Sequence, residues 1–220
     1  MKCSTLIAAA LAASFSIAAI AHDDHAGHDA AAQPKQKEAL VDVPAKKTPP
    51  DARTYFTDTE LVNQEGKKVR FYTDALEGKT VLINVIFTNC KDACPLITQR
   101  LNETRALLGD RFGKEVYYVS ISTDPVRDTP QALKKFAKKQ NADVAGWTFL
   151  TGKKENVDYV LKRLGQFSES VEDHSTLLIG GNVPNKRWTK IRPDAPPPAI
   201  AERLKELASG PMPLVPPAAN

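Results

Sequence analysis

The feature that most constrains the fold is an almost continuous apolar run over residues 81–87, Val-Leu-Ile-Asn-Val-Ile-Phe. A β-rich run without polar alternation is typical of a strand that is covered on both faces. Such a strand needs helices on both sides of its sheet, so the run predicts an α/β protein. With 220 residues, the chain is long enough to bury a core of this kind in one domain.

Helices and a second buried strand are predicted after this run. Residues 116–121 form another β-rich apolar segment, and apolar residues at helical spacing follow each of the two strands. Gly109 and Gly165 stand where two of these helices should end. The sequence Asp-Thr-Pro at residues 128–130 should open the helix between them, because Asp or Thr can cap and Pro fits an early position.

The remaining elements complete a recognisable order. Residues 60–71 should form a β-hairpin around Gln64-Glu65-Gly66. A third buried strand is predicted over residues 176–179, with a turn at residues 180–182 and a strand at residues 188–191. This order predicts a thioredoxin-like α/β fold, in which a central mixed sheet has helices on both faces and an N-terminal hairpin extension.

The N-terminal 21 residues have the pattern of a signal peptide. A basic start is followed by an apolar, Ala-rich segment that ends in Ala-Ile-Ala at Ala21. Cleavage there would remove Cys3, and it predicts a periplasmic or exported protein that is soluble and has no stable membrane span. The alternative is an N-terminal membrane anchor, against which Ser14 and Ser16 argue because they interrupt the apolar segment.

The rest of the chain divides into three parts. Residues 22–51 contain His, Pro and Lys with few large apolar side chains, so we expect a disordered arm. Residues 52–209 form the predicted domain, and residues 210–220 a Pro-rich tail. The net charge of +4 argues against a nucleic-acid partner. The arm carries three histidines, His22, His25 and His28. Metal binding by these histidines is a hypothesis, and the alternative is a solvated arm without a fixed role.

The candidate chemistry follows the first buried strand. Cys90 and Cys94 lie in the turn from strand to helix, and Pro95 predicts that the helix begins there. Amide donors and the helix dipole favour thiolates at this position. Thiolates are the nucleophiles of disulfide exchange and the soft ligands that select Cu(I) or Zn(II). A structural disulfide is the less favoured alternative, since so short a loop constrains little of the unfolded chain.

His174 is the one histidine of the predicted domain. It precedes the third buried strand, so in a thioredoxin-like sheet its loop should face the turn that carries Cys90 and Cys94. Two thiolates and one imidazole suit trigonal Cu(I), or Cu(II) with an added oxygen ligand, whereas closed zinc sites need a fourth ligand. The alternative is a solvated or hydrogen-bonded loop residue.

A thiol–disulfide oxidoreductase that uses Cys90 and Cys94 remains the second hypothesis. Two features weaken it, because residues 170–175 contain no proline opposite the cysteines and the pair is one residue wider than C-x-x-C. Metal binding is therefore favoured over disulfide exchange, although both could operate in turn.

Two groups of charged residues, around the second predicted strand and helix, each have two interpretations. Asp124 and Asp128 could orient the ligand residues by hydrogen bonding to them, although turn and capping roles are favoured. A cluster of lysines on the second helix is most simply a solvated face, with docking of an acidic partner as the alternative: Lys134, Lys135, Lys138 and Lys139.

Four segments together resemble the Sco/SenC family of thioredoxin-fold copper proteins tied to cytochrome c oxidase assembly: residues 87–95, 121–130, 147–152 and 173–175. The resemblance implies that Cys90, Cys94 and His174 are copper ligands. It also implies a metallochaperone that delivers copper to the binuclear copper centre of the oxidase, or reduces the cysteines of that centre. The implied partners are the oxidase subunit or another periplasmic copper protein, and a thiol reductant.

Overall fold

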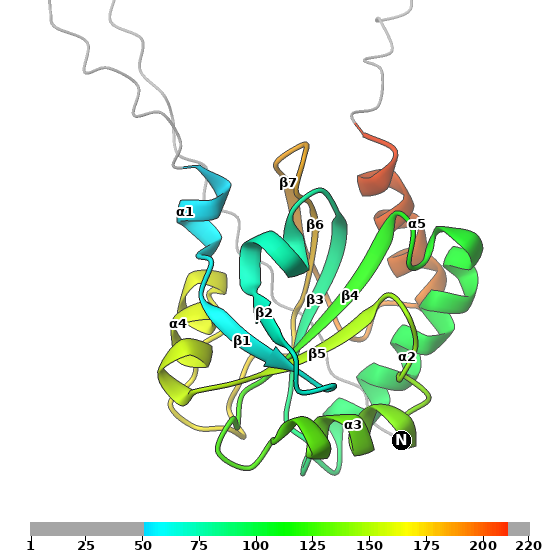
Figure 1. The fold of residues 1–220 in the computed structure, drawn as a ribbon. Coiled ribbons are helices and arrows are strands. Elements are labelled where there is room, and N and C mark those ends of the chain that lie inside the picture. Colours follow the sequence, from blue (N-terminus) through cyan, green and yellow to red (C-terminus); the bar gives the residue numbers. More distant parts are fainter. Residues whose placement is uncertain (1–50, 211–220) are drawn as a thin grey trace, which may run out of the picture. The chain divides into compact units, whose positions relative to one another are not determined.

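The computed structural model describes residues 51–210. Within them, seven strands form one sheet in the order β2-β1-β5-β4-β3-β6-β7 (Figure 1). The strands are β1 Glu60–Asn63, β2 Lys68–Arg70, β3 Thr80–Ile86, β4 Val116–Ser122, β5 Trp147–Thr151, β6 Leu178–Asn182 and β7 Arg187–Ile191. The helices are α1 Ala52–Phe56, α2 Ala93–Leu108, α3 Pro130–Lys139, α4 Lys154–Leu164 and α5 Pro197–Ala208, with a π-helix at Phe71–Leu76 and a 3₁₀ turn at Gly109–Arg111. The predicted signal peptide, the arm histidines and residues 211–220 of the tail lie outside the described residues.

The sheet is mixed, as predicted. Strands β3, β4 and β5 are parallel, whereas β6 runs antiparallel to β3 and β7 antiparallel to β6. The predicted hairpin of β1 and β2 is also confirmed, with Leu61 opposite Val69. It extends the sheet through an antiparallel contact of β1 with β5.

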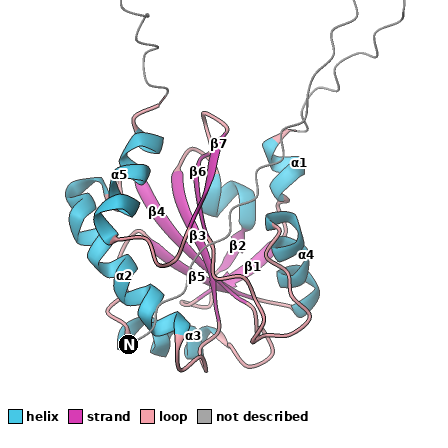
Figure 2. Ribbon diagram, turned by 180° about the vertical axis from the view of Figure 1, so that it is seen from behind, coloured by secondary structure: helices cyan, strands magenta, loops and turns pink. Residues whose placement is uncertain are grey.

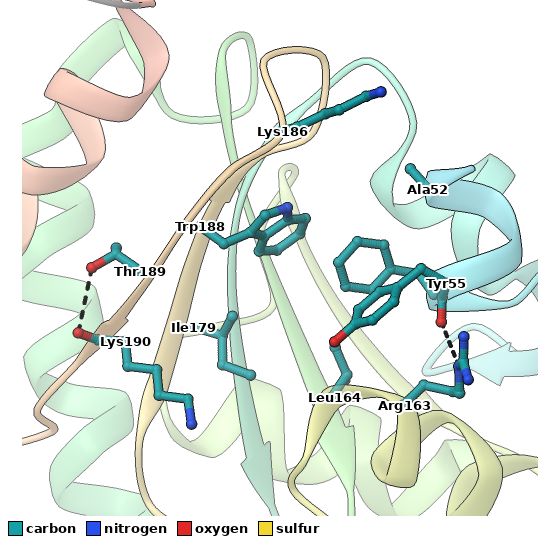
Figure 3. A pocket seen from close by; sticks show the side chains of 10 residues that line it. Ala52, Tyr55, Arg163, Leu164, Ile179, Lys186, Trp188, Thr189 and Lys190 are labelled. Atoms are coloured by element: carbon teal, nitrogen blue, oxygen red, sulfur yellow. Dashed lines mark hydrogen bonds between the residues drawn. The ribbon is translucent and has the colours of Figure 1, made fainter. Parts of the chain in front are cut away.

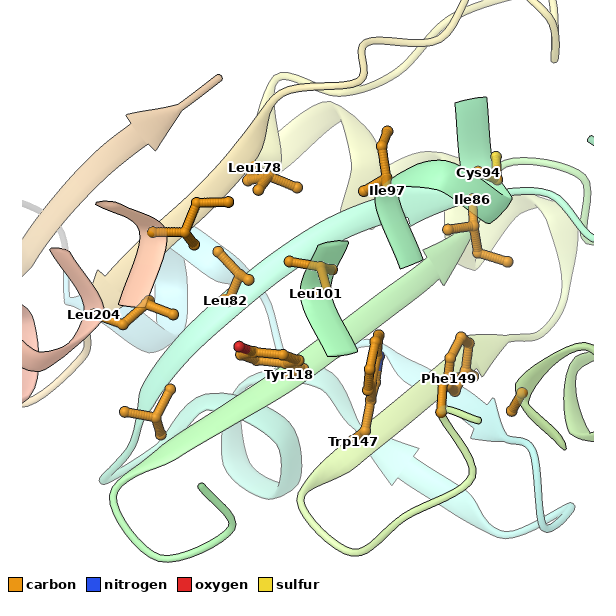
Figure 4. Packing of buried hydrophobic residues seen from close by; sticks show 14 of the residues in the cluster. Leu82, Ile86, Cys94, Ile97, Leu101, Tyr118, Trp147, Phe149, Leu178 and Leu204 are labelled. Carbon is orange, nitrogen blue, oxygen red and sulfur yellow. The ribbon is translucent and has the colours of Figure 1, made fainter. Parts of the chain in front are cut away.

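Helices cover both faces of the sheet, and β3 shows why (Figure 2). Every residue of β3 is buried. Because side chains alternate along a strand, Leu82 and Ile86 pack with residues of α2, α3 and α5 (Figure 4), whereas Val81, Ile83 and Val85 belong to the core beneath α4 and the π-helix. The uninterrupted apolar run of the sequence is therefore the signature of a strand buried on both sides.

The structure adds one strand to the predicted order and corrects one predicted turn. Strand β5 was not predicted, yet it lies between β1 and β4. The turn predicted at residues 180–182 is wrong, because these residues belong to β6 and the chain reverses at residues 183–186. The glycine has a packing reason here: a Cβ on Gly181 would lie 2.1 Å from the indole ring of Trp188. Glycine at this position lets the ring lie across the neighbouring strand.

Candidate functional site

The turn after β3 brings the two cysteines together. Cys90 lies in the turn and is partly buried, whereas Cys94 is buried in the first turn of α2. The backbone amide of Cys94 donates a hydrogen bond to Sγ of Cys90 at 3.3 Å, and both thiols are free. Helix α2 begins at Ala93, two residues before the predicted start at Pro95. Pro95 is tolerated there because the first four amides of a helix need no partner within it.

The surroundings of the two thiols separate their pKa values. Burial opposes ionisation of Cys90, but hydrogen bonds from the amides of Cys94, Asp92 and Ala93 lower its pKa overall. Burial raises the pKa of Cys94 to about 12, and its contact with Cys90 adds to the rise. The expectation that this position favours thiolates therefore holds for Cys90 and is wrong for Cys94, whose side chain lies in the core. Cys90 is therefore the more readily ionised thiol of the pair.

His174 lies beside the end of β3. It precedes β6, and because β6 is antiparallel to β3, the residues before β6 return to the carboxyl end of β3. The imidazole meets the ring of Phe87 edge to face, with 5.6 Å between the ring centroids. Its Nδ1 lies 3.0 Å from the carbonyl oxygen of Ser175. Since a carbonyl only accepts, Nδ1 is the donor in this hydrogen bond, and in the neutral imidazole the lone pair is on Nε2.

The three predicted ligands do not form a metal-binding cluster in the structure. Within residues 51–210, no three His, Cys, Asp or Glu side chains lie close enough together to hold a metal ion. The structure thus joins Cys90 to Cys94 and places His174 next to Phe87, which directly precedes their turn.

Asp128 is a site residue whose contacts the sequence did not reveal. Only 1% of its surface is exposed, and its carboxylate accepts hydrogen bonds from the amide of Thr88, from Thr88 Oγ at 2.6 Å and from Ser122 Oγ at 2.6 Å. The capping role belongs instead to Thr129, which accepts from the amide of Ala132. Burial raises the pKa of Asp128 despite these hydrogen bonds. No local signal in the sequence pairs Asp128 with Thr88.

Two hollows differ in their chemistry. The larger, of about 470 Å³, lies between α1, α4 and the β6–β7 hairpin and is lined by aromatic residues that include Tyr55 and Trp188 (Figure 3). Its lining has no thiol, imidazole or carboxylate side chain. A smaller hollow of about 280 Å³ is lined in part by Cys90.

Residues 51–210 include no helix with the length and apolar character needed to cross a membrane.

The fold and the site define a thioredoxin-like protein that carries a dithiol just after the carboxyl end of β3, an interior strand of its sheet. Residues 47–209 match the family model described as SCO1/SenC, and the chain belongs to this family.

Individual relatives agree with this assignment. A SCO2-like protein of Rickettsia felis is 32% identical over 160 residues, which cover 67% of this chain and 74% of that protein. A Stutzerimonas stutzeri protein whose name proposes copper binding is 36% identical over 109 residues, 48% of this chain and 50% of that protein. The chain spans about half the length of several curated relatives that it matches.

A solved structure shares the fold. BsSco is 26% identical to this chain, with a TM-score of 0.58. It is described as a member of the Sco family of cytochrome c oxidase assembly proteins, and as having a disulfide switch. The match covers 68% of this chain and 91% of that one.

Proposed function

We propose that this protein is a periplasmic, Sco-type copper metallochaperone. The thiolates of Cys90 and Cys94 and the imidazole of His174 hold the copper as cargo. The protein then delivers it to the binuclear copper centre of cytochrome c oxidase, or prepares that centre by reducing its cysteines. Membership of the SCO1/SenC family and the copper-binding name of the Stutzerimonas stutzeri relative support this function.

The observation that carries the proposal is that the three candidate ligand residues lie near the carboxyl end of β3, with hydrogen bonds that suit ligand atoms. Sγ of Cys90 accepts a hydrogen bond from the amide of Cys94, and Nδ1 of His174 donates one to the carbonyl oxygen of Ser175. Nε2 of His174 is then the ligand atom. Two sulfurs and one imidazole nitrogen are a donor set that suits Cu(I), and Cu(II) with an oxygen ligand added.

Copper binding requires two changes in the protein. The loop between α4 and β6 must move His174 toward the sulfurs, since no three-ligand cluster exists in residues 51–210. Cys94 must also lose its proton, because only a thiolate binds copper strongly and burial keeps this thiol protonated. Copper uptake should therefore release a proton from Cys94.

A second candidate function is thiol–disulfide exchange at the same pair. The difference between the two thiols favours it, because Cys90 is suited to attack a disulfide and Cys94 to resolve the mixed disulfide. The disulfide switch described for BsSco also supports it. A molecule whose cysteines are oxidised cannot hold copper through thiolates, so the two functions alternate and require a thiol reductant.

Copper loading of the reduced protein under anaerobic conditions tests the proposal. Wild type should retain about one copper per chain after gel filtration, and Cys90→Ser and Cys94→Ser should each retain far less, because two ligands cannot complete a trigonal site. Disulfide exchange should persist in His174→Ala, which separates the two functions. Unchanged copper content in both cysteine variants would overturn the metallochaperone proposal.

A further inference from the structure

The groove that contains Cys90 has a second wall of defined chemistry. One wall is the turn after β3, and the other is one face of α3. The residues that α3 contributes recur at the spacing of neighbours on a helix surface, so they form a continuous stripe: Ala132, Lys135, Phe136 and Lys139. Phe136 is buried and forms an apolar base, whereas Lys135 and Lys139 are exposed. The reactive thiol thus opens into a groove that has an apolar base and a cationic rim.

The charges of this rim are not neutralised by neighbours. Lys134 on the same helix pairs with Glu65 and Asp143. In the part of the chain that the structure describes, neither Lys135 nor Lys139 forms an ion pair. Two unpaired cations beside a cleft raise the local concentration of anions and their rate of encounter.

Nearby acidic groups do not cancel this field within the groove. Asp128 is close to Thr88, but its carboxylate is buried and occupied by three donors. Asp92 is exposed in the turn after Cys90, and Glu172 and Asp173 are exposed on the loop of His174; none of the three lines the groove. The α3 side of Cys90 is therefore the cationic side.

We infer that this groove selects thiols and disulfides that carry carboxylates, and that Lys135 and Lys139 position them with a sulfur atom against Cys90. The partner it fits is an acidic, cysteine-bearing segment of another protein. The inference rests on the proposed role of Cys90 as a reacting thiolate, and it assigns the acidic-docking role to two lysines of the α3 cluster.

The reaction in the groove is a two-electron exchange. The thiolate of Cys90 attacks one sulfur of the bound disulfide, whose S–S bond breaks as the mixed disulfide forms and the other sulfur leaves as a thiolate. Cys94, after giving its proton to solvent, attacks Sγ of Cys90 and releases the second sulfur as a thiolate. The protein is oxidised to a Cys90–Cys94 disulfide, and the ligand is reduced by two electrons to two thiolates.

Single-turnover kinetics with charged probes tests the inference. The reduced full chain is mixed with dianionic 5,5′-dithiobis(2-nitrobenzoate), neutral 2,2′-dithiodipyridine or dicationic cystamine at low and high salt. Lys139→Glu is compared with Lys138→Glu, a matched control that makes the same charge change at the preceding residue, which lines a different hollow. Lys135→Glu/Lys139→Glu enlarges the effect.

The double variant should react about tenfold more slowly with the anionic probe at low salt and faster with cystamine, and high salt should remove both differences. The neutral probe should react at the wild-type rate, which shows that Cys90 and the fold are intact. Lys139→Glu should slow the reaction with the anionic probe more than Lys138→Glu does. Equal effects of these two variants, or slowing with the neutral probe as well, would overturn the inference. Copper content is measured on the same variants, so a failure of copper binding is distinguished from a failure of probe selection.

Discussion

Asp128 accepts a hydrogen bond from the hydroxyl of Thr88, with 2.6 Å between the two oxygens, although the residues are 40 positions apart in the chain. The same carboxylate accepts a hydrogen bond from Ser122 at the end of β4. One buried side chain therefore joins the turn before Cys90 to the neighbouring strand. The position of the nucleophilic thiol depends on this long-range contact as well as on the local turn.

Removal of the carboxylate should destabilise both the fold and the turn. Asp128→Ala leaves the donors of Thr88 and Ser122 without a partner, so we expect a loss of about 1–3 kcal/mol in the free energy of unfolding. Thr88→Val should cost less, because the other hydrogen bonds of Asp128 remain. Urea unfolding of both single variants and the double variant measures the coupling. Strictly additive losses would show that Asp128 and Thr88 do not interact.

The buried carboxylate also predicts a pH dependence. Since burial raises the pKa of Asp128 above its ordinary value of 3.8, ionisation is harder in the folded state than in the unfolded state. The stability contributed by this group is therefore full below pH 3.8 and is lost as the pH rises through the raised pKa. The free energy of unfolding of wild type relative to Asp128→Asn should fall between pH 3.5 and pH 7. A constant difference over this range would contradict the assignment.

The two thiols should react with alkylating agents in a fixed order. In Cys94→Ser, the rate of Cys90 modification by iodoacetamide should rise with a midpoint below pH 9.0, because amide hydrogen bonds lower the pKa of Cys90. In Cys90→Ser, burial still raises the pKa of Cys94, so its modification should remain slow at pH 9. Mass spectrometry of quenched samples measures both rates. Faster labelling of Cys94 than of Cys90 at neutral pH is the contrary result.

Gly181 should tolerate no side chain while Trp188 is present. A Cβ there would lie 2.1 Å from the indole ring, so Gly181→Ala should lower the free energy of unfolding by about 1–3 kcal/mol through overpacking. The same substitution in a Trp188→Ala background should cost much less. Chemical denaturation of wild type, the two single variants and the double variant measures the free energies of unfolding. Equal losses from Gly181→Ala in both backgrounds would show that the indole ring is not the cause.

The sequence predicted those parts of the fold that depend on local patterns. The run at residues 81–87 identified β3, because a strand buried on both faces needs no polar alternation. Gly109 and Gly165 follow α2 and α4 as predicted, since both adopt positive φ at a helix end. The proximity of His174 to the turn after β3 followed from the expected order of strands.

What the sequence could not reveal depends on distant contacts. The turn signal of Gly181 was misleading, because this glycine is required by Trp188 on the neighbouring strand. The short strand β5 has no distinctive periodicity, and its place in the sheet is set by pairing with β4 and β1. The link from Asp128 to Thr88 has no local signature at all.

If His174 completes a copper site with Cys90 and Cys94, its removal should abolish that site. Anaerobic copper titration of the reduced wild type and His174→Ala, followed by absorption and EPR spectroscopy, tests it most directly, with far-UV circular dichroism to verify the fold of the variant. Wild type should develop sulfur-to-copper charge transfer that saturates near about one equivalent, and His174→Ala should lose that band. A variant whose titration and spectra match those of wild type would show that His174 is not a copper ligand.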